Sequence, residues 1–173
     1  MTDLAKIEKS LSGFITSIGR ASSWLVIAMM LVIVFDVISR RFFVIGSIKL
    51  QELEWHLHGI LFLCCLGFTY LKNAQVRVEL LREKLSPRLQ AWIEIVGCLL
   101  FLIPYCLVLV YFGFDFAHRA FVGNEVSSAA EGLPFRWIIK GFIPLGLSLL
   151  ALAGIAVILR NMIFLSHGED GNG

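Results

Sequence analysis

Four long apolar stretches separated by shorter polar segments dominate the pattern of hydrophobic and polar positions along this chain. They cover roughly residues 22–38, 53–71, 92–114 and 137–159. At about 1.5 Å per helical residue, each is about 25 to 35 Å long, close to the roughly 30 Å hydrocarbon thickness of a bilayer. Lipid offers the backbone no hydrogen-bond partners, so segments of this length must cross as helices. The pattern predicts an all-α integral membrane protein, a bundle of four transmembrane helices in a single domain, 1–173.

The segment before the first stretch has the pattern of an amphipathic helix. Its apolar positions are Leu4, Ile7, Leu11, Phe14 or Ile15, and Ile18, which are spaced by threes and fours. Two interpretations remain open: a helix lying on the inner membrane surface, or a straight extension of the first span packed on a partner. About twenty mostly polar residues precede the first stretch and no small-x-small cleavage pattern follows it, so we expect the first span to be retained.

Local signals predict where the later helices begin, bend and end. Ser86 followed by Pro87 suits an N-cap and a first helical turn, which places the start of the third helix near Pro87. Pro104 lies within the third stretch and should distort that helix, either as a hinge or as a static bend. The segment 123–134 is small and polar and should form an exposed loop on the outer side.

A stripe of small residues marks one face of the fourth stretch. Its members are Gly141, Pro144, Ser148 and Ala151, at spacings of three and four. Such a stripe lets another helix approach closely in lipid. The neighbouring helix is either internal or part of a second protein, and the pattern alone does not choose between them.

Composition and charge agree with a membrane protein. Apolar residues make up 58% of the chain and the mean hydropathy is +0.82, far from the amphipathic pattern of a soluble domain. Of the Lys and Arg residues outside the spans, nine lie on the side of the two termini and six on the other side. By the positive-inside rule both termini are predicted to be cytoplasmic. The net charge of +2, without a basic cluster, argues against nucleic acid as a partner.

Candidate redox chemistry depends on four cysteines, which all lie within the apolar stretches. Cys64 and Cys65 are adjacent and so point in different directions on a helix, whereas Cys98 and Cys106 share the third stretch. Exchange with a partner thiol needs exposure, which these positions do not provide. We interpret all four as small packing residues.

Metal and haem chemistry would have to use the histidines near the start of the second stretch. His56 and His58 are two positions apart and so point about 200° apart on a helix, which prevents joint chelation. Haem is usually held between histidines deep in the membrane, and none lies there. Instead we expect Glu52 to pair with His56, Glu54 with His58, and Asp36 with Arg40, each at the i,i+4 spacing. No cofactor is predicted.

Three motifs in order along the chain resemble one family. They are Asp36-Val37-Ile38-Ser39-Arg40-Arg41-Phe42-Phe43, then Gln51-Glu52-Leu53-Glu54, and then Asn73-Ala74-Gln75-Val76-Arg77-Val78-Glu79-Leu80. Further on, Glu131-Gly132-Leu133-Pro134-Phe135-Arg136-Trp137, followed by Lys140 and Ile143-Pro144, precedes and opens the fourth stretch. Together with the four-span layout, these motifs resemble the small membrane (DctQ-type) subunit of tripartite ATP-independent periplasmic (TRAP) transporters.

The resemblance implies a bacterial inner-membrane complex of three proteins. In it a periplasmic substrate-binding protein captures an organic acid, and a large membrane subunit carries the acid inward on a sodium gradient. The small subunit binds the large one, extends its static scaffold and helps to dock the binding protein. For this chain the partner-binding candidates that follow are Arg40, Arg41, Glu52, Glu54, Glu125, Glu131 and Arg136.

Two other functions remain open from the residues alone. A four-span membrane oxidoreductase would need a thiol pair that is reachable from outside, or a haem. A small dimeric drug exporter would need an essential carboxylate in mid-span, and Asp36 lies near the end of its stretch. The motifs of hydrolases, metalloproteases and nucleotide-binding proteins do not occur in the sequence, so we expect a protein that is not an enzyme.

Overall fold

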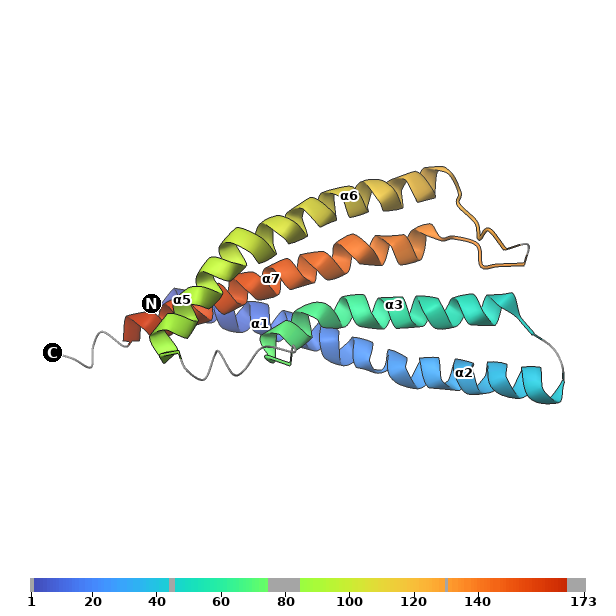
Figure 1. The fold of residues 1–173 in the computed structure, drawn as a ribbon, viewed down its shortest axis with the longest axis horizontal. Coiled ribbons are helices and arrows are strands. Elements are labelled where there is room, and N and C mark those ends of the chain that lie inside the picture. Colours follow the sequence, from blue (N-terminus) through green and yellow to red (C-terminus); the bar gives the residue numbers. More distant parts are fainter. Residues whose placement is uncertain (1, 44–45, 75–84, 130, 168–173) are drawn as a thin grey trace.

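The computed structural model describes residues 2–43, 46–74, 85–129 and 131–167, and every regular element in these ranges is a helix. In chain order the elements are α1 (Thr2–Ser23), α2 (Leu25–Phe42), α3 (Ile48–Leu71), α5 (Pro87–Gly97), a π-helical turn (Cys98–Leu102), α6 (Ile103–Val122) and α7 (Trp137–His167). Both termini lie at one end of the molecule (Figure 1), which we call the terminal end. The opposite end holds the α2–α3 connection and the α6–α7 loop, and we call it the loop end.

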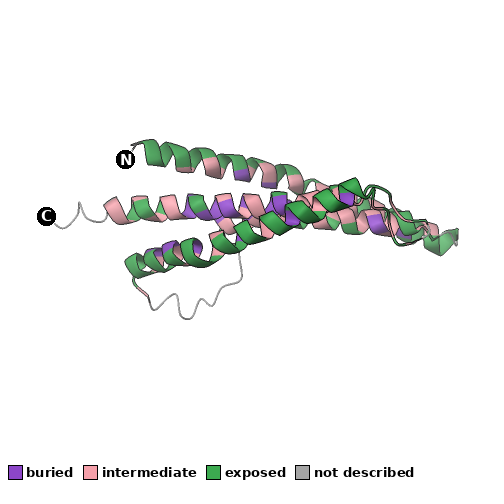
Figure 2. Cartoon of the chain, turned by 90° about the horizontal axis from the view of Figure 1, so that it is seen from above, coloured by how far each residue is buried: buried purple, intermediate pink, exposed green. Residues whose placement is uncertain are grey.

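The four long helices lie side by side in one row, in the order α2, α3, α7, α6 (Figure 1). Seen from above, they fall into a narrow band toward the loop end (Figure 2). This part of the molecule is therefore a single layer of helices, whereas the sequence pattern predicted a bundle. The edge helices α2 and α6 each have one neighbour within the layer and leave most of their surface exposed.

The main cluster of buried apolar residues lies toward the terminal end, where α1 and α5 join the row. There α1 packs on α3 and α7, and α5 packs on α7. The residues at the centre of this core are Ile15, Leu71, Cys98, Ala153, Ala156 and Val157. Small side chains on α7 allow several helices to meet within a short distance, as is usual in membranes.

Helix α1 is continuous with α2 except for a break at Trp24. Ile15 is fully buried and Leu11 packs against the core, but Phe14 on the same helix is exposed. The segment is thus an extension of the first predicted span, and the helices it packs on belong to its own chain. Whether its exposed side lies on a membrane surface stays a prediction.

The capping signals read from the sequence are confirmed. The side chain of Ser86 accepts a hydrogen bond from the backbone N–H of Leu89, and Pro87 occupies the first helical turn. Helices α3 and α6 both end on an asparagine with left-handed backbone, Asn73 (φ 54°) and Asn124 (φ 46°). In each case the next residue donates to a carbonyl five residues back, which is a Schellman motif.

The distortion predicted at Pro104 is a π-helical turn that ends at Leu102, two residues before the proline. Proline lacks a backbone N–H and its ring collides with the carbonyl of the residue four positions earlier, so the regular hydrogen-bond ladder cannot continue through this point. The chain accommodates this with the five-residue turn Cys98–Leu102. As a result, α5 and α6 follow a curved path along the row (Figure 1).

Three helical segments of the described residues are long and apolar enough to cross a membrane: Asp3–Phe42, Pro87–Val122 and Trp137–Ser166. Each contains one predicted span, namely 22–38, 92–114 or 137–159. The predicted span 53–71 lies in α3, which has 24 residues but is not among the three, because Glu54, His56 and His58 lower its mean hydropathy. The motif predicted at 73–80 lies outside the described residues from position 75 onward.

Candidate partner-binding surface at the loop end

The α6–α7 loop, residues 123–136, is tied to the start of α3 by one buried carboxylate. Glu52 is 9% exposed; its Oε1 accepts from the hydroxyl of Ser127, and its Oε2 accepts from the backbone N–H of Leu133 at 2.6 Å. A methyl group at Gly132 would lie 2.9 Å from Oε1 and 2.2 Å from Cβ of Ser127. The loop therefore closes tightly over Glu52, and we call this contact the Glu52 latch.

The surroundings of Glu52 favour its charged form. The hydroxyl of Ser127 and then the N–H of Leu133, both donating to the carboxylate, hold its pKa below the ordinary value of 4.5, with smaller contributions from the positive charges of Arg136 and His56. Partial burial acts in the opposite direction and is outweighed. Glu52 comes just before the predicted span 53–71. These interactions therefore lie at the loop end, outside the predicted membrane-spanning segment.

An ion pair joins the first limb of the loop to α7. Glu125 pairs with Lys140, whose side chain is 15% exposed. The ammonium group also lies 3.9 Å from the centroid of the Phe116 ring on α6. Nearby, Phe121 and Trp137 meet edge to face with centroids 5.2 Å apart. These contacts fix both ends of the loop to the helices that it joins.

A third polar cluster links α2 to α3. Arg40 pairs with Asp36, as predicted, and Asp36 is 4% exposed. With the Gln51 amide oriented to suit its surroundings, its oxygen accepts from Nη2 and Nη1 of Arg40 at 2.6 and 2.8 Å. Gln51 on α3 thereby hydrogen-bonds the Asp36–Arg40 pair of α2 and connects the two helices. This connection was not predicted as a contact.

The seven predicted partner-binding residues differ in exposure and in contacts. It brings Glu52 and Arg136 together, but Arg41 and Glu131 remain exposed. Glu54 is half-buried, and its Oε1 is buried without a hydrogen-bond partner among the described residues. The ring of His56 is hydrogen-bonded to the backbone oxygen of Glu52, and the charge of His56 acts on the Glu52 carboxylate, whose hydrogen bonds come from the loop.

Sequence reasoning missed Ser127 and Gln51 as contacts and did not consider Lys140 as the partner of Glu125. Lys140 carried a signal, because a lysine in the first turn of an apolar helix needs a counter-charge. Ser127 carried none, since it lies 75 positions after the residue it bonds.

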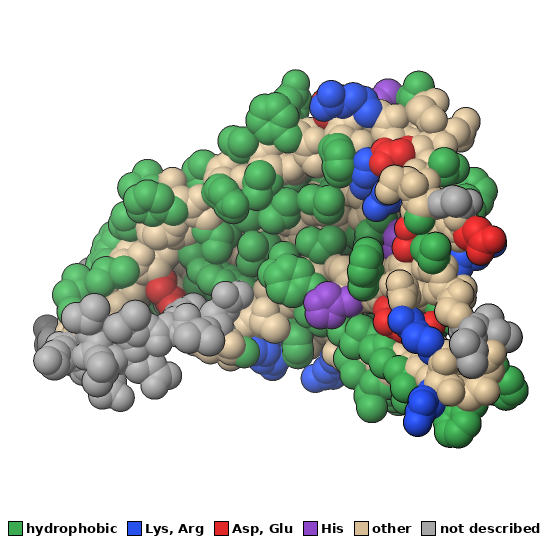
Figure 3. All heavy atoms as spheres, turned by 45° about the vertical axis from the view of Figure 1, so that its right-hand side comes forward, with side chains coloured by type: hydrophobic (Ala, Val, Ile, Leu, Met, Phe, Trp, Pro, Cys, Tyr) green, Lys and Arg blue, Asp and Glu red, His purple; other side chains and the backbone are tan. Residues whose placement is uncertain are grey.

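Apolar side chains cover the exposed faces of the two edge helices, while charged groups gather at the loop end (Figure 3). On α2, Leu31 and Phe35 are 67% and 60% exposed; on the other edge, Phe101 of the π-helical turn and Tyr111 of α6 are both 73% exposed. Surfaces of this kind are stable only against lipid or another apolar protein surface. The two edges of the row are therefore available to partners within a membrane.

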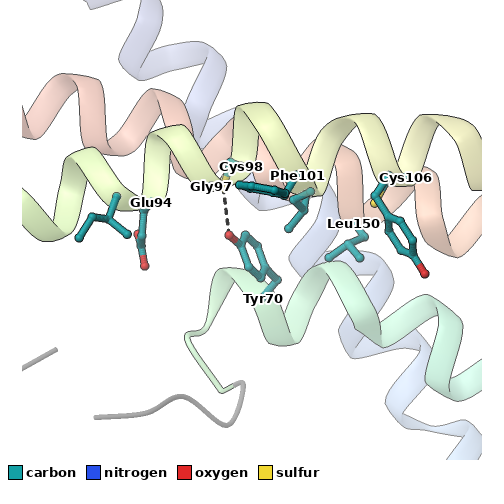
Figure 4. Close-up of a pocket in the computed structure, with 10 residues that line it drawn as sticks. Tyr70, Glu94, Gly97, Cys98, Phe101, Cys106 and Leu150 are labelled. Atoms are coloured by element: carbon teal, nitrogen blue, oxygen red, sulfur yellow. Dashed lines mark hydrogen bonds between the residues drawn. The ribbon is translucent and has the colours of Figure 1, made fainter. Parts of the chain in front are cut away.

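An apolar groove of about 600 Å³ runs beside the π-helical turn at the terminal half, between α3, α5, α6 and α7 (Figure 4). The hydroxyl of Tyr70 and the sulfur of Cys98 are hydrogen-bonded across it at 3.0 Å. Near one end, Glu94 accepts from the amide of Asn161 at 3.0 Å, which links α5 to α7. All four cysteines are free thiols, and Cys64, Cys98 and Cys106 are buried, consistent with the packing role predicted for them.

The described residues contain no group of three or more His, Cys, Asp or Glu side chains placed to hold a metal ion. The loop end combines an internal ion pair with exposed apolar and charged side chains.

Comparison with known proteins gives one family. The family described as "Tripartite ATP-independent periplasmic transporters, DctQ component" matches residues 29–163, more than three quarters of the chain. The matched range includes most of the row of helices and the whole loop end. No curated protein matches the chain.

Proposed function

Because the chain belongs to the DctQ family, the small permease subunits of TRAP transporters, we propose that it joins a large membrane subunit and extends the static part of that subunit. The family is a transporter component and not an enzyme. The proposal rests on this family match, whose range includes the helices with exposed apolar faces. In lipid, a second membrane protein that packs on such an edge is stabilised by close contact between helices.

We place the chain in the bacterial inner membrane with four spans and both termini in the cytoplasm. Three of the spans have the length and composition required, and α3 is the fourth because it lies within the same row. An even number of passes puts both termini at one end, in agreement with the excess of Lys and Arg there. The loop end then faces the periplasm.

The transported solute is an organic acid, driven inward by a sodium gradient, and both properties belong to the other two proteins. The large subunit carries the solute and the periplasmic substrate-binding protein selects it. This chain supplies a scaffold, with a loop end that docks the binding protein.

At the residue level, Arg40, Arg41 and Glu54 are proposed to hold the large subunit. Arg41 is exposed, and Glu54 offers an unpartnered acceptor. Glu52 orders the loop from within, whereas Glu131 offers its exposed charge to the binding protein. Glu125 and Arg136 support the loop on which Glu131 lies.

Reconstitution tests this division of labour. Proteoliposomes containing this chain, the large subunit and the binding protein should accumulate a radiolabelled organic acid under an inward sodium gradient. Vesicles with this chain alone should accumulate none, and vesicles without it should lose most uptake.

Uptake by the lone chain, or full uptake in its absence, would contradict the proposal. A sodium-free gradient of the same osmolarity is the control for coupling.

A further inference from the structure

The α6–α7 loop exposes two large apolar side chains beyond the ends of the helices. Val126 is 62% exposed and Phe135 is 59% exposed. Both lie outside the candidate membrane segments, which end at Val122 and resume at Trp137. In the orientation proposed above, these side chains face water, where exposed apolar groups of this size usually mark a binding surface.

The backbone of the loop brings Val126 and Phe135 opposite each other. The N–H of Arg136 donates to the carbonyl of Glu125 at 3.2 Å, and the N–H of Ser127 donates to the carbonyl of Leu133 at 3.3 Å. Between these two bonds one limb has a single residue, Val126, and the other has two, Pro134 and Phe135. The extra residue makes a bulge, as in a β-bulge, and the bulge directs a side chain away from the regular pairing.

Phe135 holds a backbone conformation that aromatic residues rarely adopt. Its φ is 63°, in the left-handed region where a side chain crowds the following carbonyl. Such conformations persist only where surrounding contacts impose them, and they cluster at functional sites. Here the Glu52 latch holds one limb through Leu133, two residues before Phe135, and Glu125 and Lys140 hold the other limb.

We propose that Val126 and Phe135 form the apolar centre of the surface that binds the soluble periplasmic component, with Glu52 as the residue that positions it. This rests on the proposed function. Glu131 is the exposed charge of the same loop, whereas Glu125 is paired and Glu52 is buried. The surface therefore fits a partner that presents an apolar depression with a basic residue at its rim, where Phe135 is the anchor.

Binding of the cognate substrate-binding protein to the complex of this chain and the large subunit in nanodiscs tests the inference. Phe135→Asn removes the ring but keeps a residue that tolerates the left-handed conformation, so the loop remains folded. We expect the affinity to fall by about tenfold or more, as for an aromatic anchor. Phe43→Asn makes the same change at another exposed position of the loop end and should change affinity by less than about twofold.

The positioning role of Glu52 has a separate readout. Glu52→Ala should weaken binding and also remove the hydrogen-exchange protection of the Leu133 amide, whereas Phe135→Asn should weaken binding and leave that protection intact. If Glu52→Ala leaves the protection unchanged, Glu52 does not position the loop.

The inference is overturned if Phe135→Asn binds as the unmodified complex does, or if Phe43→Asn weakens binding equally. It is also overturned if a nitroxide at position 135 is shielded by lipid rather than accessible to a water-soluble relaxation agent. Failure of the proposed function looks different, because the unmodified complex would then not bind the substrate-binding protein at all.

Discussion

Two glutamates near the start of α3 have different hydrogen-bond partners although they are close in sequence. Glu52 and Glu54 are two positions apart, so their side chains point about 200° apart around the helix. Glu52 faces the α6–α7 loop and has donors for both oxygens. Glu54 has one buried oxygen that no described residue bonds. The first carboxylate is bonded within the chain, and the second is the one proposed to bind the large subunit.

The Glu52 latch predicts a pH-dependent loop. Because the folded-state pKa of Glu52 is lowered from 4.5, the charged form stabilises the closed loop. That stability is present above the ordinary pKa and is lost as pH falls through the lower folded-state value. Exchange of the Leu133 amide, corrected for intrinsic rates, should therefore be slow at neutral pH and should accelerate in acid.

Glu52→Gln is the control for this prediction. It keeps the size of the side chain and removes the titrating group, so the acid-dependent acceleration should disappear. An identical pH profile in both proteins would show that another group controls the loop.

At the loop end, contacts between residues close in sequence could be predicted, whereas contacts between residues far apart in sequence could not. The pairing of Asp36 with Arg40 follows from helix geometry over four residues, and the sequence predicted it. The Glu52 latch joins Glu52 to Ser127, which lies 75 positions later, and to Leu133, which lies 81 positions later. The bond from Leu133 uses its backbone N–H, so no side chain in the sequence indicates it. The left-handed Phe135 follows from that closure, so it too was beyond the sequence pattern.

At the scale of elements, close contact between α3 and α7 depends on positions without a side chain. A Cβ at Gly67 would lie 2.7 Å from the carbonyl oxygen of Leu149, and one at Gly146 would lie 2.6 Å from that of Leu63. Backbone atoms cannot move aside as a flexible side chain can. The small-residue stripe predicted on α7 began with Gly141, where a Cβ meets nothing within 4 Å. Spacing identified a helix that packs closely, but it did not identify which glycine is in contact.

This difference gives a matched pair of substitutions on one helix. Gly146→Ala should separate α7 from α3 and lower the free energy of unfolding by roughly 1–3 kcal/mol. Gly141→Ala adds the same methyl group in open space and should be neutral, or stabilising by up to about 1 kcal/mol. Unfolding of the chain in mixed micelles by increasing denaturing detergent measures both. Equal effects of the two substitutions would argue against close α3–α7 contact at Gly146.

The distortion of the third span shows the limit of a local argument. The missing N–H of Pro104 predicts that the helix cannot continue regularly through this point. The form of the distortion also reflects packing, because Cys98 at the start of the π-helical turn is buried and bonds Tyr70. Packing of this kind depends on a helix nearly thirty residues earlier in the chain.

At the scale of the whole molecule, hydrophobic pattern predicted the helices but not their arrangement. The length and apolar content of each stretch follow from bilayer thickness, which acts on every helix separately. The order α2, α3, α7, α6 in a single row depends on which faces pack, and every long stretch is apolar nearly all around. The prediction of a bundle lacked this information.

Topology is the prediction that belongs to this scale. A phosphatase reporter, active only in the periplasm, should be active when inserted at Ser128 and inactive when fused after residue 173. A fluorescent protein that matures only in the cytoplasm should give the opposite pattern. Phosphatase activity at the C-terminus alone would reverse the orientation, and activity at both positions would mean an even number of passes between them, so that α7 does not cross the membrane once.

The single layer toward the loop end also limits what this protein can do by itself. A wall one helix thick has two broad sides, and the helices described there enclose no lumen between them. A passage along this wall needs another polypeptide against one of its sides. A subunit of this shape can form one side of a transport pathway, and other polypeptides have to form the remaining sides.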